Sequence, residues 1–471
     1  MQTFNPPTHG QTRPGLLLAS ILPASCLFVL LVLFFSPRPL QNRAAPGAAA
    51  STGITSPPMR VIHSGRGLSP RQTRLDLPAS SARPAEEIVA EKLSQFASQR
   101  QEIVAAMARH FNVPLPEDVD RFFAAVHAGR WEETTNLYAI LSQRRASEDC
   151  PPGLAQLWPA LHETFGVAEQ AHEWPAQNLL DYGNAVLDSL RPGMAYIGGT
   201  DAGRFIPTLL TDTGEGEPHI VLTQNALANG TYLEYLKFRY GERLATLTSD
   251  ESQSSFATYI ADAEKRFQHD QQFPEAPKQV RPGEDIQITD GRVAVSGQIA
   301  VMAINEHLLQ TLLQKNPDLT FALEESSPLK SLYAGATTLG PITELRATDP
   351  ASALTAERAA QALDYWRTTT QNLLAEPDAA AAAAPRDAYL SLILGQAHLF
   401  LDRNLSGEAE QAYQLAHQLS PDNLAVVFGY TGLLVDQQRY EEARQVAQAA
   451  ANLVPDNNQL SDLLHRLHGM K

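Results

Sequence analysis

Two short stretches repeat near the C-terminus: Leu-Ser-Pro-Asp-Asn at residues 419–423 and Leu-Val-Pro-Asp-Asn at residues 453–457. A helical pattern precedes each stretch. Its small, aromatic and proline positions are Ala409, Tyr413, Ala416 and Pro421 in the first copy, and Ala443, Ala447, Ala450 and Pro455 in the second. Small residues are needed where paired helices cross closely, and proline ends a helix. The pattern predicts stacked helical hairpins.

The offset between the two copies matches the period of tetratricopeptide repeats, which is about 34 residues. We therefore expect such helical repeats over residues 354–471. Two units alone are marginal, and helices near residues 356–374 and 459–468 are expected to cap them. Such repeats present a surface to another protein. By helical position, Leu394, His398 and Phe428 are expected to face the inner groove and contact that partner.

The charge is unevenly distributed along the chain. The net charge of the 471 residues is -16, from 36 basic and 52 acidic residues. Residues 1–83 hold eight Arg and a single acid, Asp76, so this segment is about +7, and the remaining 28 bases and 51 acids give about -23. A body this acidic disfavours nucleic acid as a partner, because binding to phosphates needs a basic face.

An uncharged apolar run covers residues 15–35. It is long enough to cross a hydrocarbon core of roughly 30 Å, so we expect a transmembrane helix at residues 15–36, after a tail at 1–14. A cleaved signal peptide and a lipid-modified Cys26 are the alternatives, although the run is longer than a signal peptide needs. Arg13 on one flank faces Arg38 and Arg43 on the other, so the charge rule for orientation is close to a tie.

Between the apolar run and the body lies a linker at residues 37–84, rich in Pro, Ala and Arg and expected to be disordered. Residues 85–176 form a helical region, in which 118–128 and 131–143 are either a degenerate repeat or a simple helical pair. Short strands and helices then alternate over residues 177–347, which predicts an α/β domain with a short, mostly parallel sheet. Asp290-Gly291 predicts a β-hairpin within it.

A glycine-rich loop is the first candidate ligand site, because it follows the expected strand at residues 194–197 and precedes a helix. Its residues are Gly198, Gly199, Thr200, Asp201 and Arg204. Free amides at a helix start attract anions, and the Arg204 guanidinium suits phosphate or carboxylate. The alternative is structural: the glycines make a tight turn, Thr200 or Asp201 caps the helix, and Arg204 pairs with an acid.

Further polar residues follow two other expected strands: Thr223, Gln224 and Asn225 after one, and Glu324 after the other. In open α/β sheets such loops meet at one edge and bind ligands there. Asp201 and Glu324 could then act as an acid and base or hold a cation, or all of these could be ordinary loop residues. We find no metal-ligand spacing and no pattern for a nucleophile, and we expect no cofactor.

Three blocks carry a family resemblance: residues 198–205, 222–228 and 231–232. From about residue 84 the chain resembles membrane-anchored tetratricopeptide proteins of Verrucomicrobia-type bacteria. More distantly, the blocks are similar to the soluble part of bacterial protein O-mannosyltransferase-like membrane proteins, whose loop is Gly-Asp-Asn-Asp-x-x-Pro. This chain departs from that loop at Thr200 and Arg204, and it has a single predicted membrane segment.

The resemblance implies a single-pass protein of the bacterial inner membrane with a periplasmic body, and it argues against carrying over transferase activity. We therefore expect a membrane-tethered protein-interaction or assembly module of the bacterial envelope, without catalysis. The alternative is a sugar-phosphate or nucleotide-sugar binding protein, or a glycosyltransferase-related enzyme, that uses the α/β domain.

Overall fold

A computed structural model describes residues 83–147, 150–151, 153–281, 283–289, 292–324, 335–345, 354–376 and 383–470. Within these ranges no helix is both long enough and apolar enough to cross a membrane. The transmembrane helix predicted at residues 15–36 and nearly all of the linker predicted at 37–84 lie outside the described residues. Both remain predictions.

A helical base comes first, and its elements are α1 (Ala85–Phe111), α2 (Glu117–His127), α3 (Trp131–Ala146) and α4 (Leu154–Glu173). Pro84 and Pro116 stand at the starts of α1 and α2, where a missing N–H costs nothing. The fully buried side chains of Met107, Phe122 and Leu141 pack these helices into one core. The predicted helical region is therefore present, and α4 is an additional helix that the sequence pattern did not indicate.

The central sheet is mixed, which corrects the expected mostly parallel one. In the part of the chain that the structure describes, five strands run in the order β2-β1-β5-β7-β6. The parallel half is β2 (Ile220–Thr223), β1 (Ala195–Gly198) and β5 (Phe321–Leu323). The antiparallel half is β7 (Ile342–Leu345) and β6 (Thr337–Leu339), joined by a tight turn with Gly340 at φ +56°. A turn this short can only join antiparallel strands.

Helices surround the sheet: α5 (Ala176–Leu187), α6 (Asp201–Asp212) and α7 (Gly230–Tyr240). Two tyrosines of α7 protect the outer edge of β2. The Tyr240 hydroxyl accepts a hydrogen bond from Val221 N at 3.1 Å, and the Tyr232 hydroxyl accepts one from Thr223 N at 2.7 Å. Unpaired strand edges invite pairing with other chains, so these hydroxyls close that edge.

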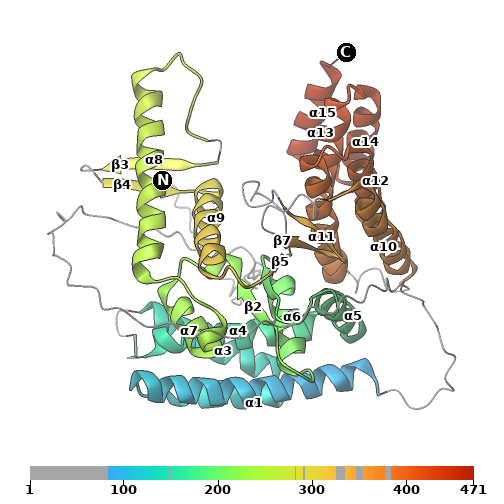
Figure 1. The fold of residues 1–471 in the computed structure, drawn as a ribbon. Helices are drawn as coiled ribbons and strands as arrows, with labels where there is room; N and C mark the ends of the chain where they lie inside the picture. The colour runs from blue at the N-terminus through green and yellow to red at the C-terminus, as the bar shows by residue number, and fades with distance from the viewer. Residues whose placement is uncertain are drawn as a thin grey trace, which may run out of the picture.

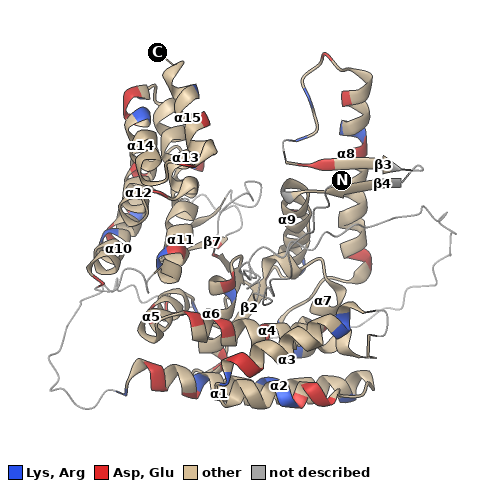
Figure 2. Cartoon of the chain, turned by 180° about the vertical axis from the view of Figure 1, so that it is seen from behind, with Lys and Arg blue, Asp and Glu red and all other residues tan. Residues whose placement is uncertain are grey.

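Two arms rise from the base in Figure 1. One arm comprises α8 (Ser249–Gln272), α9 (Gln298–Lys315) and the hairpin of β3 (Asp285–Thr289) and β4 (Arg292–Ser296). The predicted hairpin is thus confirmed, but it forms a separate two-stranded sheet. This arm has a small core of its own around Tyr259 and Ile286. Acidic and basic residues occur on the base and on both arms (Figure 2).

The second arm contains the predicted repeats. Its helices are α10 (Ala356–Ala375), α11 (Ala383–Asp402), α12 (Ser406–Leu419), α13 (Leu424–Asp436), α14 (Tyr440–Leu453) and α15 (Asn458–His468). The repeated Asn is a helix cap: Asn423 Oδ1 accepts from Ala425 N and Val426 N, and Asn457 caps α15 in the same way. The repeated alanines of α12 and α14 are fully buried at the helix crossings.

The repeats and the α/β domain share one continuous apolar core. Gln396 of α11 joins them, because its Oε1 accepts from the Trp366 indole at 2.9 Å and its Nε2 donates to Gly340 O at 2.8 Å. The Gln396 and Trp366 side chains are at most 1% exposed. The rings of Tyr389 on α11 and Tyr182 on α5 meet edge to face, 5.3 Å apart. The α/β domain therefore covers the end of the repeat stack, as a capping repeat does in a solenoid.

Candidate functional site

The carboxyl ends of the parallel strands bring the predicted loops together. Gly198 pairs with Thr223 in register, and Ile197 pairs with Leu323. Glu324 therefore emerges beside Gly199. The convergence of the three loops at one edge of the sheet is what the sequence pattern predicted.

Glu324 occupies the place where a bound anion was expected. Its Oε2 accepts hydrogen bonds from Gly199 N at 2.7 Å and Thr200 N at 2.9 Å, and its Oε1 accepts from the Thr200 hydroxyl. The Tyr182 hydroxyl donates to Oε1 at 3.2 Å. Glu324 is 1% exposed. The two amides that immediately precede α6 are thus bonded to a carboxylate of the chain itself.

Close packing at this site explains two glycines, one on each side of the loop. A Cβ atom at Gly203 would lie 1.8–1.9 Å from the Glu324 carboxyl atoms, and one at Gly198 would lie 2.7–2.8 Å from the backbone of Gly203 and Arg204. Neither separation is sterically possible. Gly203 therefore permits the close approach of Glu324, and Gly198 permits the close approach of the first turn of α6 to β1.

The remaining loop residues take the structural roles that were considered as the alternative. Thr200 caps α6, since its hydroxyl accepts from Gly203 N at 2.9 Å. Arg204 forms an ion pair with Asp201 within the first turn, and its guanidinium lies 4.3 Å from the centre of the Phe205 ring. Asp201 is thus paired with a cation, whereas Glu324 is bonded to the loop amides and to two hydroxyls.

The second polar loop adds little to a pocket. Thr223 is half-buried, Gln224 is buried within a short 3-10 turn, and Asn225 is exposed. A cavity of about 270 Å³ instead lies near the amino ends of the strands. It is lined by Lys92, Asn184, Leu187, Asp188, Leu210, Thr211, Gly214, Glu215, Glu217 and His219. Among the described residues, no group of three or more His, Cys, Asp or Glu could hold a metal ion.

Sequence reasoning missed the neighbours of the loop on α4. Burial lowers the pKa of His162 to about 4, aided by Arg204, and the ring shares a 2.8 Å hydrogen bond with the Tyr138 hydroxyl. Burial also raises the pKa of Glu169 to about 7, with Glu173 and Asp201 adding to the rise. Pro159 lies inside α4 and Gly166 packs against Phe205, and both residues disfavour a helix in the sequence.

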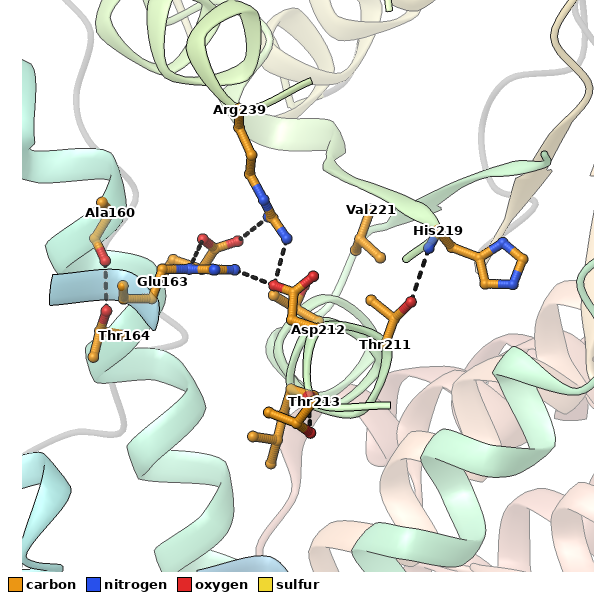
Figure 3. Close-up of polar contacts among 12 residues, drawn as sticks. Ala160, Glu163, Thr164, Thr211, Asp212, Thr213, His219, Val221 and Arg239 are labelled. Atoms are coloured by element: carbon orange, nitrogen blue, oxygen red, sulfur yellow. Dashed lines mark hydrogen bonds and ion pairs between the residues drawn. The ribbon is translucent and has the colours of Figure 1, made fainter. Parts of the chain in front are cut away.

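Four buried charged side chains form a ring of ion pairs between helices (Figure 3). The carboxylates of Glu163 and Asp212 each bind both Arg100 and Arg239, with Arg100 Nε 3.0 Å and Arg239 Nη1 3.1 Å from Glu163. The Tyr235 hydroxyl donates to Glu163 as well. The two positive and two negative charges balance, and they link α1, α4, α6 and α7. We interpret this ring as structural, because each buried charge has partners of opposite sign.

The three repeat residues chosen from the sequence lie on one stripe. Leu394, His398 and Phe428 are all half-buried. One repeat period separates Leu394 from Phe428, so they occupy equivalent positions of α11 and α13. We call the whole set the inner stripe: Ser391, Leu394, His398 and Leu401 on α11, and Ala425, Phe428, Gly432 and Val435 on α13.

The inner stripe is apolar along α13. Ala425 and Gly432 are exposed, Phe428 and Val435 are half-buried, and the opposite face of α13 is packed into the core. On α15 the equivalent positions are polar, with Asp462 matching Phe428 and Arg466 matching Gly432. The inner stripe therefore ends at the last helix.

Comparison with known proteins gives one family match: a tetratricopeptide repeat model matches residues 405–467. No curated protein and no solved structure matches the chain. The resemblance to Verrucomicrobia-type and O-mannosyltransferase-like proteins thus remains an expectation from the sequence. Residues 405–467 are similar to tetratricopeptide repeats, and such repeats suggest a protein-interaction module.

Proposed function

We propose that this chain is a protein-interaction or assembly module that binds a partner protein along the inner stripe of α11 and α13. The observation that carries the proposal is the apolar, partly exposed face of α13 within a segment that matches tetratricopeptide repeats. Stacked helical repeats typically bind their partners along the surface that successive repeats form together. The shared core with the α/β domain would hold this face in one orientation.

The same proposal includes the membrane. The apolar run at residues 15–35 supports a single-pass anchor in the bacterial inner membrane, with the body in the periplasm. Alkaline extraction of membranes tests the anchor. The full chain should stay in the pellet, and a variant that lacks residues 15–36 should move to the supernatant. Protease added to spheroplasts should digest the body if it is periplasmic, and a protected body would refute that orientation.

The alternative of a sugar-phosphate site in the α/β domain is not favoured. A phosphate at the start of α6 would have to displace the Glu324 carboxylate from two backbone amides and two hydroxyls. Like charges at that spot repel, so the two anions cannot share it. We therefore propose no catalysis for the loop.

Crosslinking in native membranes tests partner binding. A photo-crosslinking amino acid at Ala425 of the full-length chain should give a defined adduct, and the same group at Gly407 on α12 should give none. Gly432→Glu should abolish the adduct and Gly407→Glu should not. Both glycines are exposed and helical, and a Cβ at either one meets no atom within 4 Å, so they form a matched pair. Equal adducts from both positions, or an adduct unaffected by Gly432→Glu, would refute the inner stripe as the binding surface.

A further inference from the structure

Carboxylates stand at both ends of the inner stripe. Asp422 precedes the cap of α13 and Asp436 is its last residue, and both are exposed. Asp387 on α11 lies close enough to Asp422 for their charges to interact. Burial raises the pKa of Asp387, with Asp422 adding to the rise and Arg386 opposing it. Two carboxylates and one guanidinium therefore stand at this end of the inner stripe.

Two arginines near the start of α14 are paired with acids of the arm itself. Arg439 pairs with Glu410 and Glu442, and Arg444 pairs with Glu441. On α15, Asp462 and Arg466 stand at the stripe-equivalent positions and balance each other. Residues 421–437, which contain α13, include Asp422 and Asp436 and no Lys or Arg, so the charge of this segment is negative and sits at its two ends. It has the same sign as the net charge of about -23 carried by residues 84–471.

Resting on the proposed function, we propose that the occupant of the inner stripe is a helical segment of the partner with an apolar face flanked at both ends by Lys or Arg. The apolar positions of α13 recur at spacings of three, four and three residues, which is one face of a helix. The acids lie at the ends of this face and not along its sides. A partner helix that meets both must therefore run along α13.

Geometry also gives the spacing of the basic residues. At a rise of about 1.5 Å per residue, α13 from Leu424 to Asp436 is roughly 18 Å long, and Asp422 lies just before it, so roughly 20 Å separates the two aspartates along the helix axis. A partner helix reaches both carboxylates when its two groups of basic residues are as far apart in sequence as Asp422 and Asp436 are. We call this separation the helical spacing. An extended segment, at roughly 3.3 Å per residue, would need them only about six positions apart, which we call the extended spacing. The two forms of partner therefore differ in a measurable way.

The test uses fluorescence anisotropy with labelled synthetic peptides and the full-length chain in nanodiscs. The first peptide is a helix with four leucines at spacings of three, four and three, and with lysine pairs at the helical spacing. The second replaces the lysines by glutamates, and the third places the lysine pairs at the extended spacing. We expect the first peptide to bind at least tenfold more tightly than the second at low salt, and more tightly than the third. The preference for lysine should shrink in about 0.5 M salt.

Variants connect the preference to the named carboxylates. Asp422→Asn together with Asp436→Asn should weaken binding of the first peptide about fivefold and leave the second unchanged or improved, since exposed ion pairs contribute modestly. Gly432→Glu should abolish binding of the first peptide, and Gly407→Glu should leave it unchanged. Equal binding of the lysine and glutamate peptides, both blocked by Gly432→Glu, would overturn the charge assignment while the proposed function survives.

Three other outcomes also decide between these possibilities. If no peptide binds although Ala425 still crosslinks in membranes, the partner is not a segment of this chemistry. If the lysine peptide binds only after removal of residues 1–82, the chain's own arginine-rich segment fills the inner stripe, and a partner is not its resident occupant. Loss of both peptide binding and crosslinking would instead remove the proposed function itself.

Discussion

Replacing Glu324 by alanine should destabilise the protein, because this carboxylate is the acceptor for the loop at the start of α6. The change leaves Gly199 N and Thr200 N without the partners that they have at 2.7 and 2.9 Å. Each buried donor left unpaired costs roughly 1–3 kcal/mol, so the two amides together cost about 2–6 kcal/mol. Water that enters the vacated space will offset part of this cost. We therefore expect a loss of about 3 kcal/mol.

Urea unfolding of the full-length chain in mild detergent, followed by circular dichroism, measures the loss. Glu132→Ala serves as the control, because Glu132 is an exposed glutamate and the change should stay within about 0.5 kcal/mol. Glu324→Gln should fall between the two. Its carbonyl oxygen can accept from the two amides, but its NH2 group takes the place of the oxygen to which the Thr200 and Tyr182 hydroxyls donate, so those hydroxyls must turn.

Formate provides a second readout for the same site. It should stabilise the Glu324→Ala variant by supplying a carboxylate to the empty amides, about 1.4 kcal/mol at ten times its dissociation constant. Wild type should not respond, because Glu324 already fills the position. A Glu324→Ala variant as stable as wild type, or a formate effect equal in both proteins, would refute this account of the loop.

Three further predictions concern the junction, the loop neighbours and the charge ring. Gln396→Leu leaves the Trp366 indole and Gly340 O unpaired at the junction and should cost about 2–4 kcal/mol in urea unfolding, and Trp366→Phe in the same background should add less than it does alone. Folding raises the pKa of Glu169 from a reference value of 4.5 to about 7, so the folded state holds its proton more tightly and the free energy of unfolding falls as pH rises through this range. Glu169→Gln should therefore stabilise the protein at pH 8, by about 1 kcal/mol after solvent screening, and have little effect at pH 4; a gain at pH 4 would contradict the assignment. Arg100→Met removes one cation from the buried ring and should cost about 3–5 kcal/mol, and a loss under about 1 kcal/mol would mean that the ring is not structural.

The repeats could be predicted because their signals are local. Asn423 and Asn457 cap helices through their own neighbouring amides, and the buried alanines recur at helical spacing. A single sequence carries such short-range information directly. The convergence of the loops after β1, β2 and β5 was also predictable, since parallel strands end at one edge of a sheet.

Contacts between distant parts of the chain were not predictable. Glu324 contacts Gly199 across 125 residues of sequence. No local pattern distinguishes a carboxylate that occupies an anion site from one that only lies next to it. Nothing in the sequence of the short strands β6 and β7 indicated that they run antiparallel, and the turn at Gly340 between them became evident only in the structure. Helix α4 was hidden by its internal Pro159, and with it the neighbours His162 and Glu169.

Hydrogen exchange followed by mass spectrometry can distinguish the repeats from the α/β edge as the binding surface, on the full-length chain with and without the partner captured by crosslinking at Ala425. We predict slower exchange of backbone amides in α11 and α13 when the partner is bound, and unchanged exchange in residues 198–204 of the β1–α6 loop. Protection of that loop with no change in α13 would contradict the account, because it would mean that the α/β edge, and not the repeats, binds the partner.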